Sequence, residues 1–207
     1  MAWNANEPTM GNTIAADIPA IEENFQCLND RFAYGELWIP ASIMIPTTTN
    51  GAAAGTFEFT TNDLMVDYYA FDNTTEEYTS VNVVFPIDYD LGTINAKFYC
   101  SSATGSSAGD TVEWKISGTA IRNDYPLDHA QGTGQTAVAT MLADNGADLQ
   151  ITGATGAITI GDTPNLGGMI NLKFSRNVSG TDDMTEDAWL FGVLIQYGRT
   201  NAEVSAW

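Results

Sequence analysis

From Glu36 onward, short apolar stretches alternate with turn-forming Gly, Asn, Asp and Thr residues about every 8 to 15 residues. Several stretches have a period of two, which is typical of β-strands with one buried and one solvated face. Val112, Trp114 and Ile116 would point one way, with polar residues between them. The last stretch gives the longest apolar stripe. Its members are Trp189, Phe191, Val193, Ile195 and Tyr197.

Nine to eleven short strands with such turns predict a mainly β chain that folds as an antiparallel β-sandwich or jelly roll. No internal repeat occurs, so a solenoid or propeller is not expected. The predicted strands are 37–45, 56–61, 64–71, 79–86, 93–101, 111–121, 135–141, 148–152, 157–161, 168–176 and 188–198.

A different pattern precedes the strands. Residues 1–13 are polar and are expected to form an extended arm, and one short helix is predicted at 18–33. Asp17 can cap this helix and Pro19 suits its first turn. We therefore divide the chain into an arm and helix at 1–35 and a head domain at 36–207. The apolar positions of the helix are spaced 4, 3, 4, 3, 4, and they are Ile14, Ile18, Ile21, Phe25, Leu28 and Phe32.

That spacing is a heptad seam, which has two interpretations. The helix could pack on the body of its own chain, or it could form a short coiled coil between copies of the chain. Two heptads are too short to hold a coiled coil alone, so the bodies would have to associate as well. The bulky Phe25 and Phe32 would fill a three-chain core better than a two-chain core.

The charge balance excludes some partners. The chain has 207 residues with 7 Lys and Arg against 26 Asp and Glu, a net charge of −19. Nucleic acids and anionic membranes bind basic faces, so neither is an expected partner. The uncharged stretch 37–57 is broken by Pro40 and Pro46 and is not a membrane span. Residues 1–13 lack a basic start and an apolar run, so no secretory signal peptide is expected.

Residues for catalysis are sparse. His129 is the one histidine, and no nucleophile motif accompanies it. Cys27 and Cys100 fall in a predicted helix and a predicted strand, and we expect two buried free thiols. A two-carboxylate glycosidase would need two acids across a cleft, whereas most strand carboxylates are simply solvated, so no enzymatic activity is expected. The candidate acids are Glu58, Asp67, Asp88 and Glu113.

Two further groups of residues could bind ligands. The acidic loop before the last strand is expected to be solvated, although its oxygens could also ligate Ca²⁺; no other cofactor is expected. Its acids are Asp182, Asp183, Glu186 and Asp187. In the strand 64–71, at least one of Tyr68 and Tyr69 should point outward, because they are adjacent. Such a tyrosine would contact a glycan or line an edge or subunit interface.

Three segments resemble proteins of tailed-phage virions. Met1-Ala2-Trp3 with Pro8 and the acidic helix start Ile18–Phe25 are similar to the amino-terminal anchors of fibre and head-fibre proteins. Leu37–Ala53 resembles the opening of small β-sandwich virion proteins, and Trp189–Tyr197 resembles their last strand. Gly11-Asn12-Thr13 departs from the Gly/Ser-rich link that is usual there, which leaves capsid, neck and tail open as docking places.

The resemblance implies a homotrimer on the outside of a virion. An arm containing Trp3 and Pro8 would attach it to other virion proteins, a three-helix coil would set the symmetry, and the β-domain would face the medium. The chain is thus expected to be a non-enzymatic head fibre, decoration protein or short tail fibre that contacts host glycans. The alternatives are a stand-alone carbohydrate-binding β-sandwich and, less favoured, a polysaccharide-degrading enzyme.

Overall fold

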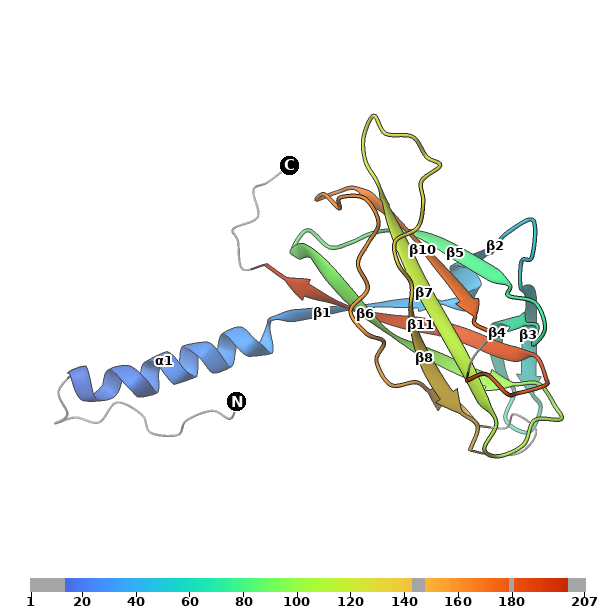
Figure 1. Cartoon of the computed structure of the whole chain (residues 1–207). Helices are drawn as coiled ribbons and strands as arrows, with labels where there is room; N and C mark the ends of the chain where they lie inside the picture. The colour runs from blue at the N-terminus through green and yellow to red at the C-terminus, as the bar shows by residue number, and fades with distance from the viewer. Residues whose placement is uncertain (1–13, 143–147, 179–180, 201–207) are drawn as a thin grey trace.

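The computed structural model describes residues 14–142, 148–178 and 181–200. Two antiparallel sheets pack face to face, and one helix projects away from them (Figure 1). The elements in chain order are α1 (Ile14–Arg31), β1 (Tyr34–Pro40), a 3-10 turn (Ala41–Ile43), β2 (Ile45–Pro46), β3 (Ala53–Phe59), β4 (Leu64–Phe71), β5 (Tyr78–Val84), β6 (Tyr89–Ser102), β7 (Thr111–Ile121), β8 (Gln135–Thr140), β9 (Gln150–Ile151), β10 (Met169–Arg176) and β11 (Ala188–Arg199).

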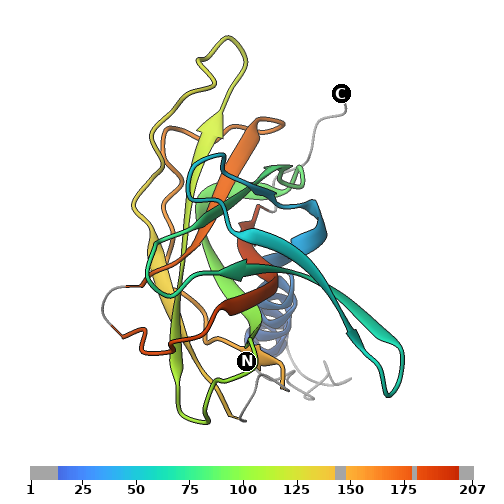
Figure 2. The ribbon, with the colours of Figure 1, turned by 90° about the vertical axis from the view of Figure 1, so that its right-hand side faces the viewer.

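The six-stranded sheet has the order β3-β4-β11-β6-β9, with β1 also paired to β11. The strands β4 and β1 share one edge of β11, because β4 pairs with residues 188–190 and β1 with residues 192–198. The five-stranded sheet has the order β2-β5-β10-β7-β8. Figure 2 shows the two layers and the β3–β4 hairpin, which protrudes from the sandwich.

The core lies between the inner faces of the two sheets. Trp114 of β7 is fully buried and meets two aromatic rings from the other sheet. The Phe71 ring lies edge-on to it at a centroid distance of 5.2 Å, and the Phe98 ring stacks on it at 5.7 Å. The inward positions of β10, Ile170, Leu172 and Phe174, are buried, as expected for alternate residues of a strand with one face in the core. Burial of such side chains is the main stabilisation of a sandwich.

The prediction of a mainly β, antiparallel β-sandwich with one N-terminal helix is therefore confirmed. The predicted arm, residues 1–13, lies outside the described residues. The helix begins and ends earlier than predicted, at residues 14 and 31 instead of 18 and 33. Pro19 consequently lies inside α1, where it removes one backbone hydrogen bond, and not in the first turn.

Three strand predictions need correction. The segment 37–45 is two strands, because the 3-10 turn after Pro40 carries the chain from one sheet to the other. The segment 157–161 forms isolated bridges at Ile158 and Gly161 instead of a strand. In β11 the register shifts between Leu190 and Gly192, so one extra residue changes which side chains face inward. The five-residue stripe is thereby split: Val193, Ile195 and Tyr197 are buried, whereas Trp189 and Phe191 are only half-buried.

Candidate functional site

The apolar face of α1 is exposed. The helix extends from the sandwich and lies along neither sheet (Figure 1). The sandwich of the same chain therefore does not cover the apolar side chains of the helix that the structure describes. The interpretation in which the helix packs on the body of its own chain is wrong for these residues. We call this set the seam, with exposed fractions of 43% for Ile18, 37% for Ile21, 67% for Phe25, 39% for Leu28 and 60% for Phe32. The side chain of Ile14 lies outside the described residues.

Apolar exposure continues from the helix into the first strand. Tyr34 and Trp38 occupy alternate positions of β1 and are 63% and 45% exposed. The Trp38 ring packs edge-on against Tyr99 of β6, with ring centroids 4.9 Å apart, on the outer face of the six-stranded sheet. Exposed apolar side chains therefore occur on both α1 and β1, with the charged Glu36 between Tyr34 and Trp38 on the same face of the strand. The sandwich thus supplies apolar surface next to the helix.

The two tyrosines predicted as glycan contacts lie on opposite faces of β4. Tyr69 is buried and its hydroxyl donates a hydrogen bond to the Met44 carbonyl at 2.9 Å, so Tyr69 belongs to the core. Tyr68 points outward, as expected for one of the pair. Its ring stacks on Trp189 at a centroid distance of 4.4 Å, so each ring already covers one face of the other.

A shallow polar hollow lies beside Tyr68. It has a volume of about 300 Å³ and is lined by Ser42, Thr56 and Asp67 among others. The Thr56 hydroxyl donates to the Asp67 carboxylate at 2.9 Å, which orients that acid. Asp67 and Tyr69 share one face of β4, so the hollow presents hydroxyl and carboxylate oxygens on the face opposite to the Tyr68 ring.

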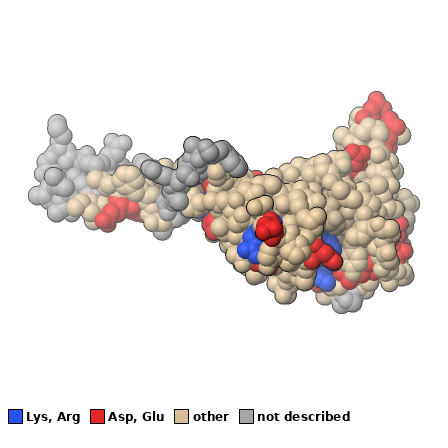
Figure 3. All heavy atoms as spheres, turned by 90° about the horizontal axis from the view of Figure 1, so that it is seen from above, with Lys and Arg blue, Asp and Glu red and all other residues tan. Residues whose placement is uncertain are grey.

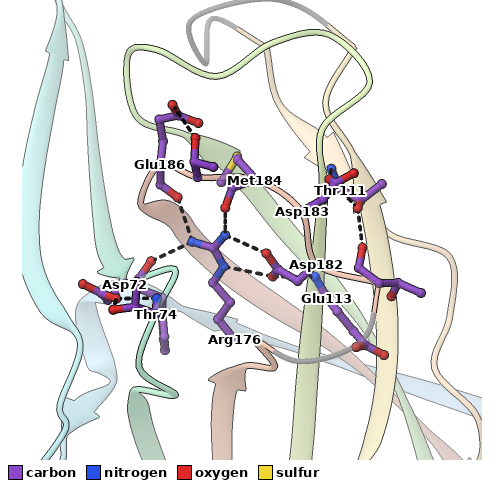
Figure 4. Close-up of polar contacts among 12 residues, drawn as sticks. Asp72, Thr74, Thr111, Glu113, Arg176, Asp182, Asp183, Met184 and Glu186 are labelled. Atoms are coloured by element: carbon purple, nitrogen blue, oxygen red, sulfur yellow. Dashed lines mark hydrogen bonds and ion pairs between the residues drawn. The ribbon is translucent and has the colours of Figure 1, made fainter.

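The acidic loop is organised by a buried arginine. Arg176 is fully buried at the end of β10, and Asp182 faces it with hydrogen bonds of 2.9 Å from Nε and 2.7 Å from Nη2. Its Nη1 also donates to the carbonyls of Phe71 at 3.2 Å and Glu186 at 2.7 Å, and its Nη2 donates to the Met184 carbonyl. Figure 4 shows this arginine between the loop and the end of β4. A buried charge needs such full pairing, so the loop is a structural clasp.

The other predicted calcium ligands have separate partners. Asp183 accepts hydrogen bonds from the Thr111 backbone N–H at 2.6 Å and from its hydroxyl at 2.7 Å. These bonds, the backbone bond first, hold the pKa of Asp183 below its usual value. Glu186 accepts from the Thr185 hydroxyl at 3.0 Å, and Asp187 is exposed. No group of three or more His, Cys, Asp or Glu among the described residues is placed to hold a metal ion.

Sequence reasoning missed Arg176, although a signal was present. The alternation of Ile170, Leu172 and Phe174 continues to position 176, which places a cation on the inward face of a strand. The chain has few basic residues, and an acidic run begins six residues later. An inward arginine beside an acidic run is therefore the pattern that would have identified the clasp.

The remaining candidates are dispersed. Glu58 and Asp67 lie on the β3–β4 hairpin, Asp88 pairs with Arg199, and Glu113 accepts a hydrogen bond from Asn177 at 2.7 Å on the other sheet. Cys27 and Cys100 lie in α1 and β6, as predicted, and both are free thiols. Burial raises the pKa of Cys100 to about 12 and keeps it a neutral thiol.

The surface reflects the acidic composition. On the face that Figure 3 shows, Asp and Glu are spread over head and helix, and the few Lys and Arg lie next to acids. None of the helices in the described part of the chain has the length and apolar character to cross a membrane.

No protein-family model matches the chain, and no curated protein sequence matches it. Among solved structures it is similar to a carbohydrate-binding module specific for non-crystalline cellulose, at 12% identity over 76% of this chain and 86% of that one, TM-score 0.38. It is also similar to a family 61 carbohydrate-binding module in complex with β-1,4-galactotriose, at 10% identity over 83% and 94%, TM-score 0.32. A third is a protein of unknown function from Shewanella oneidensis, at 11% identity over 96% and 100%, TM-score 0.34. Likenesses this distant do not bear on what the present chain binds.

Proposed function

We propose that this chain is a non-enzymatic structural protein that assembles through α1 into a homotrimer. The observation that carries the proposal is the exposed heptad seam on a helix that projects from its own sandwich. A heptad stripe that is open to water in one chain is buried when copies of the helix align their stripes. Full burial of such a side chain contributes roughly 1.5–3 kcal/mol, and seam side chains that are 37% to 67% exposed gain the corresponding part of this.

The adjoining sandwich supports the same assembly. A helix of 18 residues gives about two heptads, which is too short to hold copies together alone. The exposed Tyr34 and Trp38 supply additional apolar area where β1 leaves the helix. Three copies are favoured over two because the bulky Phe25 and Phe32 need a wide core.

The resemblance to tailed-phage proteins supports a place for this trimer on the virion surface, as a head fibre, decoration spike or short tail fibre. In this proposal an arm attaches the trimer to another virion protein. The predicted anchor residues Trp3 and Pro8 lie outside the described residues. An antibody against the purified sandwich should label the outside of purified phage particles, and label that stays on free protein would contradict the virion assignment.

A pair of variants tests the assembly. Phe25→Glu places a charge in the seam, and sedimentation should then give a monomer. Gln26→Glu adds the same charge to an exposed neighbouring position off the seam, and the oligomer should persist. Equal sedimentation of the two variants would contradict assembly through the seam of α1.

A second candidate function is glycan binding by the sandwich. It is favoured by the outward-facing Tyr68 ring, which stacks on Trp189, and by the hollow on the other face of the same hairpin, where Thr56 and Asp67 present oxygens. Saccharides bind to such combinations of polar groups and aromatic surface. Tyr68→Ala should lower glycan binding if the Tyr68 ring contacts the glycan, and an unchanged affinity would exclude this ring as a contact.

A further inference from the structure

The outer face of the five-stranded sheet carries a second polar hollow, on the opposite sheet from Tyr68. Its volume is about 380 Å³, which falls in the range of small-molecule sites. Asn82 of β5, Asn171 of β10 and Thr119 of β7 form one row across its floor, because Asn171 is the register partner of both others. The loop between β7 and β8 supplies His129 and Gln131 to its wall.

Hydrogen bonds between amides fix the orientation of the polar groups. Gln131 Nε2 donates to Asn171 Oδ1 at 2.8 Å, and Asn171 Nδ2 donates to Asn82 Oδ1 at 2.9 Å. Each bond uses one donor and one acceptor, so the three amides retain further donors and acceptors. The three amides are therefore neutral groups whose orientation is fixed and that can both donate and accept.

Two polar atoms in this region lack a partner. Thr119 is 3% exposed, and its hydroxyl oxygen makes no hydrogen bond to any described residue. The same holds for His129 Nε2. An unpaired buried polar group lowers stability, so its presence points to a role in binding.

The loop that forms the wall is braced against the sheet. The Gly132 N–H donates to the Gly118 carbonyl at 2.9 Å. Arg122 pairs with Asp162 at 3.1 Å and lies 4.3 Å above the Tyr125 ring, and Tyr125 in turn stacks on His129 at 4.6 Å. A wall held in this way is preorganised, which reduces the entropy lost when a ligand binds.

We propose that this hollow binds a neutral saccharide. Sugar hydroxyls both donate and accept hydrogen bonds, which matches the amide row and the Thr119 hydroxyl. Leu127 and Met169 give the rim an apolar part for the C–H face of a sugar ring. The described residues that line the hollow include Asp128 but no Lys or Arg. An acidic sugar would therefore be repelled by the Asp128 carboxylate. The inference rests on the second candidate function and assigns it a different site.

Two variants and one control test the site in the full-length chain. Thr119→Val keeps the side-chain shape and removes an oxygen without a protein partner, so thermal stability should stay the same or rise. Asn82→Ala alters an exposed side chain that accepts one hydrogen bond.

Binding is first sought on an array of neutral and sialylated oligosaccharides and then measured by calorimetry with the best neutral trisaccharide. Each variant should weaken binding about five- to tenfold, as expected for one lost hydrogen bond. The control Asn62→Ala changes an exposed turn residue outside both hollows and should leave it unchanged. Tyr68→Ala is measured alongside to test the other sheet.

Each alternative result overturns the proposal. Loss of binding in Tyr68→Ala with full binding in Asn82→Ala would place the site on the other sheet and retain glycan binding as a function. Binding of sialylated glycans alone would contradict the neutral class. No binding to any glycan would contradict both the site and the second candidate function. The Phe25→Glu monomer should bind one trisaccharide per chain with unchanged affinity. Failure of assembly through α1 and failure of the saccharide site are therefore separate results.

Discussion

Loss of Arg176 should lower the stability of the fold strongly. It is fully buried and paired with Asp182, whose side chain is 3% exposed. Arg176→Met would leave that carboxylate buried without its cation, and we expect a loss of about 3–5 kcal/mol in unfolding free energy. Urea denaturation of the purified protein measures this loss.

The half-exposed ion pair of Arg122 and Asp162 provides the control. Their side chains are 31% and 18% exposed, and such pairs contribute about 0–1 kcal/mol. Arg122→Met should therefore cost far less than Arg176→Met. Equal losses in the two variants would contradict the structural role of the clasp.

Acidic pH should weaken the fold through carboxylates that accept hydrogen bonds. The Thr74 hydroxyl and then its backbone N–H lower the pKa of Asp72 below 3.8. A carboxyl with a lower pKa in the folded state stabilises that state above its unfolded pKa and loses the contribution as pH falls through the folded pKa. Stability should consequently fall below about pH 4.

The variant Asp72→Asn isolates this effect. The amide keeps an acceptor oxygen for Thr74 but does not titrate. Urea midpoints at pH 6 and pH 3 should differ less in Asp72→Asn than in the unchanged protein. An equal decrease in both proteins would show that Asp72 does not contribute to the acid sensitivity.

Among the single elements, α1 should depend on contact with other copies of the chain for its helical structure. An isolated helix of this length is marginal in water. Dilution should therefore lower the helical circular dichroism at 222 nm as the copies separate, while the near-ultraviolet signal of buried Trp114 stays constant. Helix content that is independent of concentration would contradict the dependence of α1 on assembly.

The sequence predicted the existence of the elements better than their registers. Short apolar stretches between turn-forming residues located β4, β7 and β10 within about one residue. This pattern could not locate the extra residue in β11, because a bulge changes the inward positions without changing the composition. Nor did it show that 37–45 crosses between sheets, since both halves are apolar strands.

The candidate sites were predictable to different degrees. The seam follows from heptad spacing, which the sequence carries in full. The outward position of either Tyr68 or Tyr69 follows from strand geometry, but the choice between them depends on the pairing of β4. The polar row of Asn82, Asn171 and Thr119 joins three strands that are far apart in the chain, so only the sheet order reveals it.

At the scale of the whole molecule, charge opposes assembly. A net charge of −19 per chain becomes −57 in a trimer. Salt screens this repulsion over a Debye length of about 10 Å at 0.1 M. Raising NaCl from 0.05 M to 0.5 M should lower the dissociation constant of the oligomer, measured by sedimentation. Weaker assembly at high salt would show that ion pairs, and not the apolar seam, hold the copies together.

The mass of the full-length chain in solution tests the central claim most directly. Light scattering should give three times 22.2 kDa, or about 67 kDa, because exposed seams of three copies are buried together. A mass near 22.2 kDa at micromolar concentration would contradict the account, since the seam of α1 would then remain open to water.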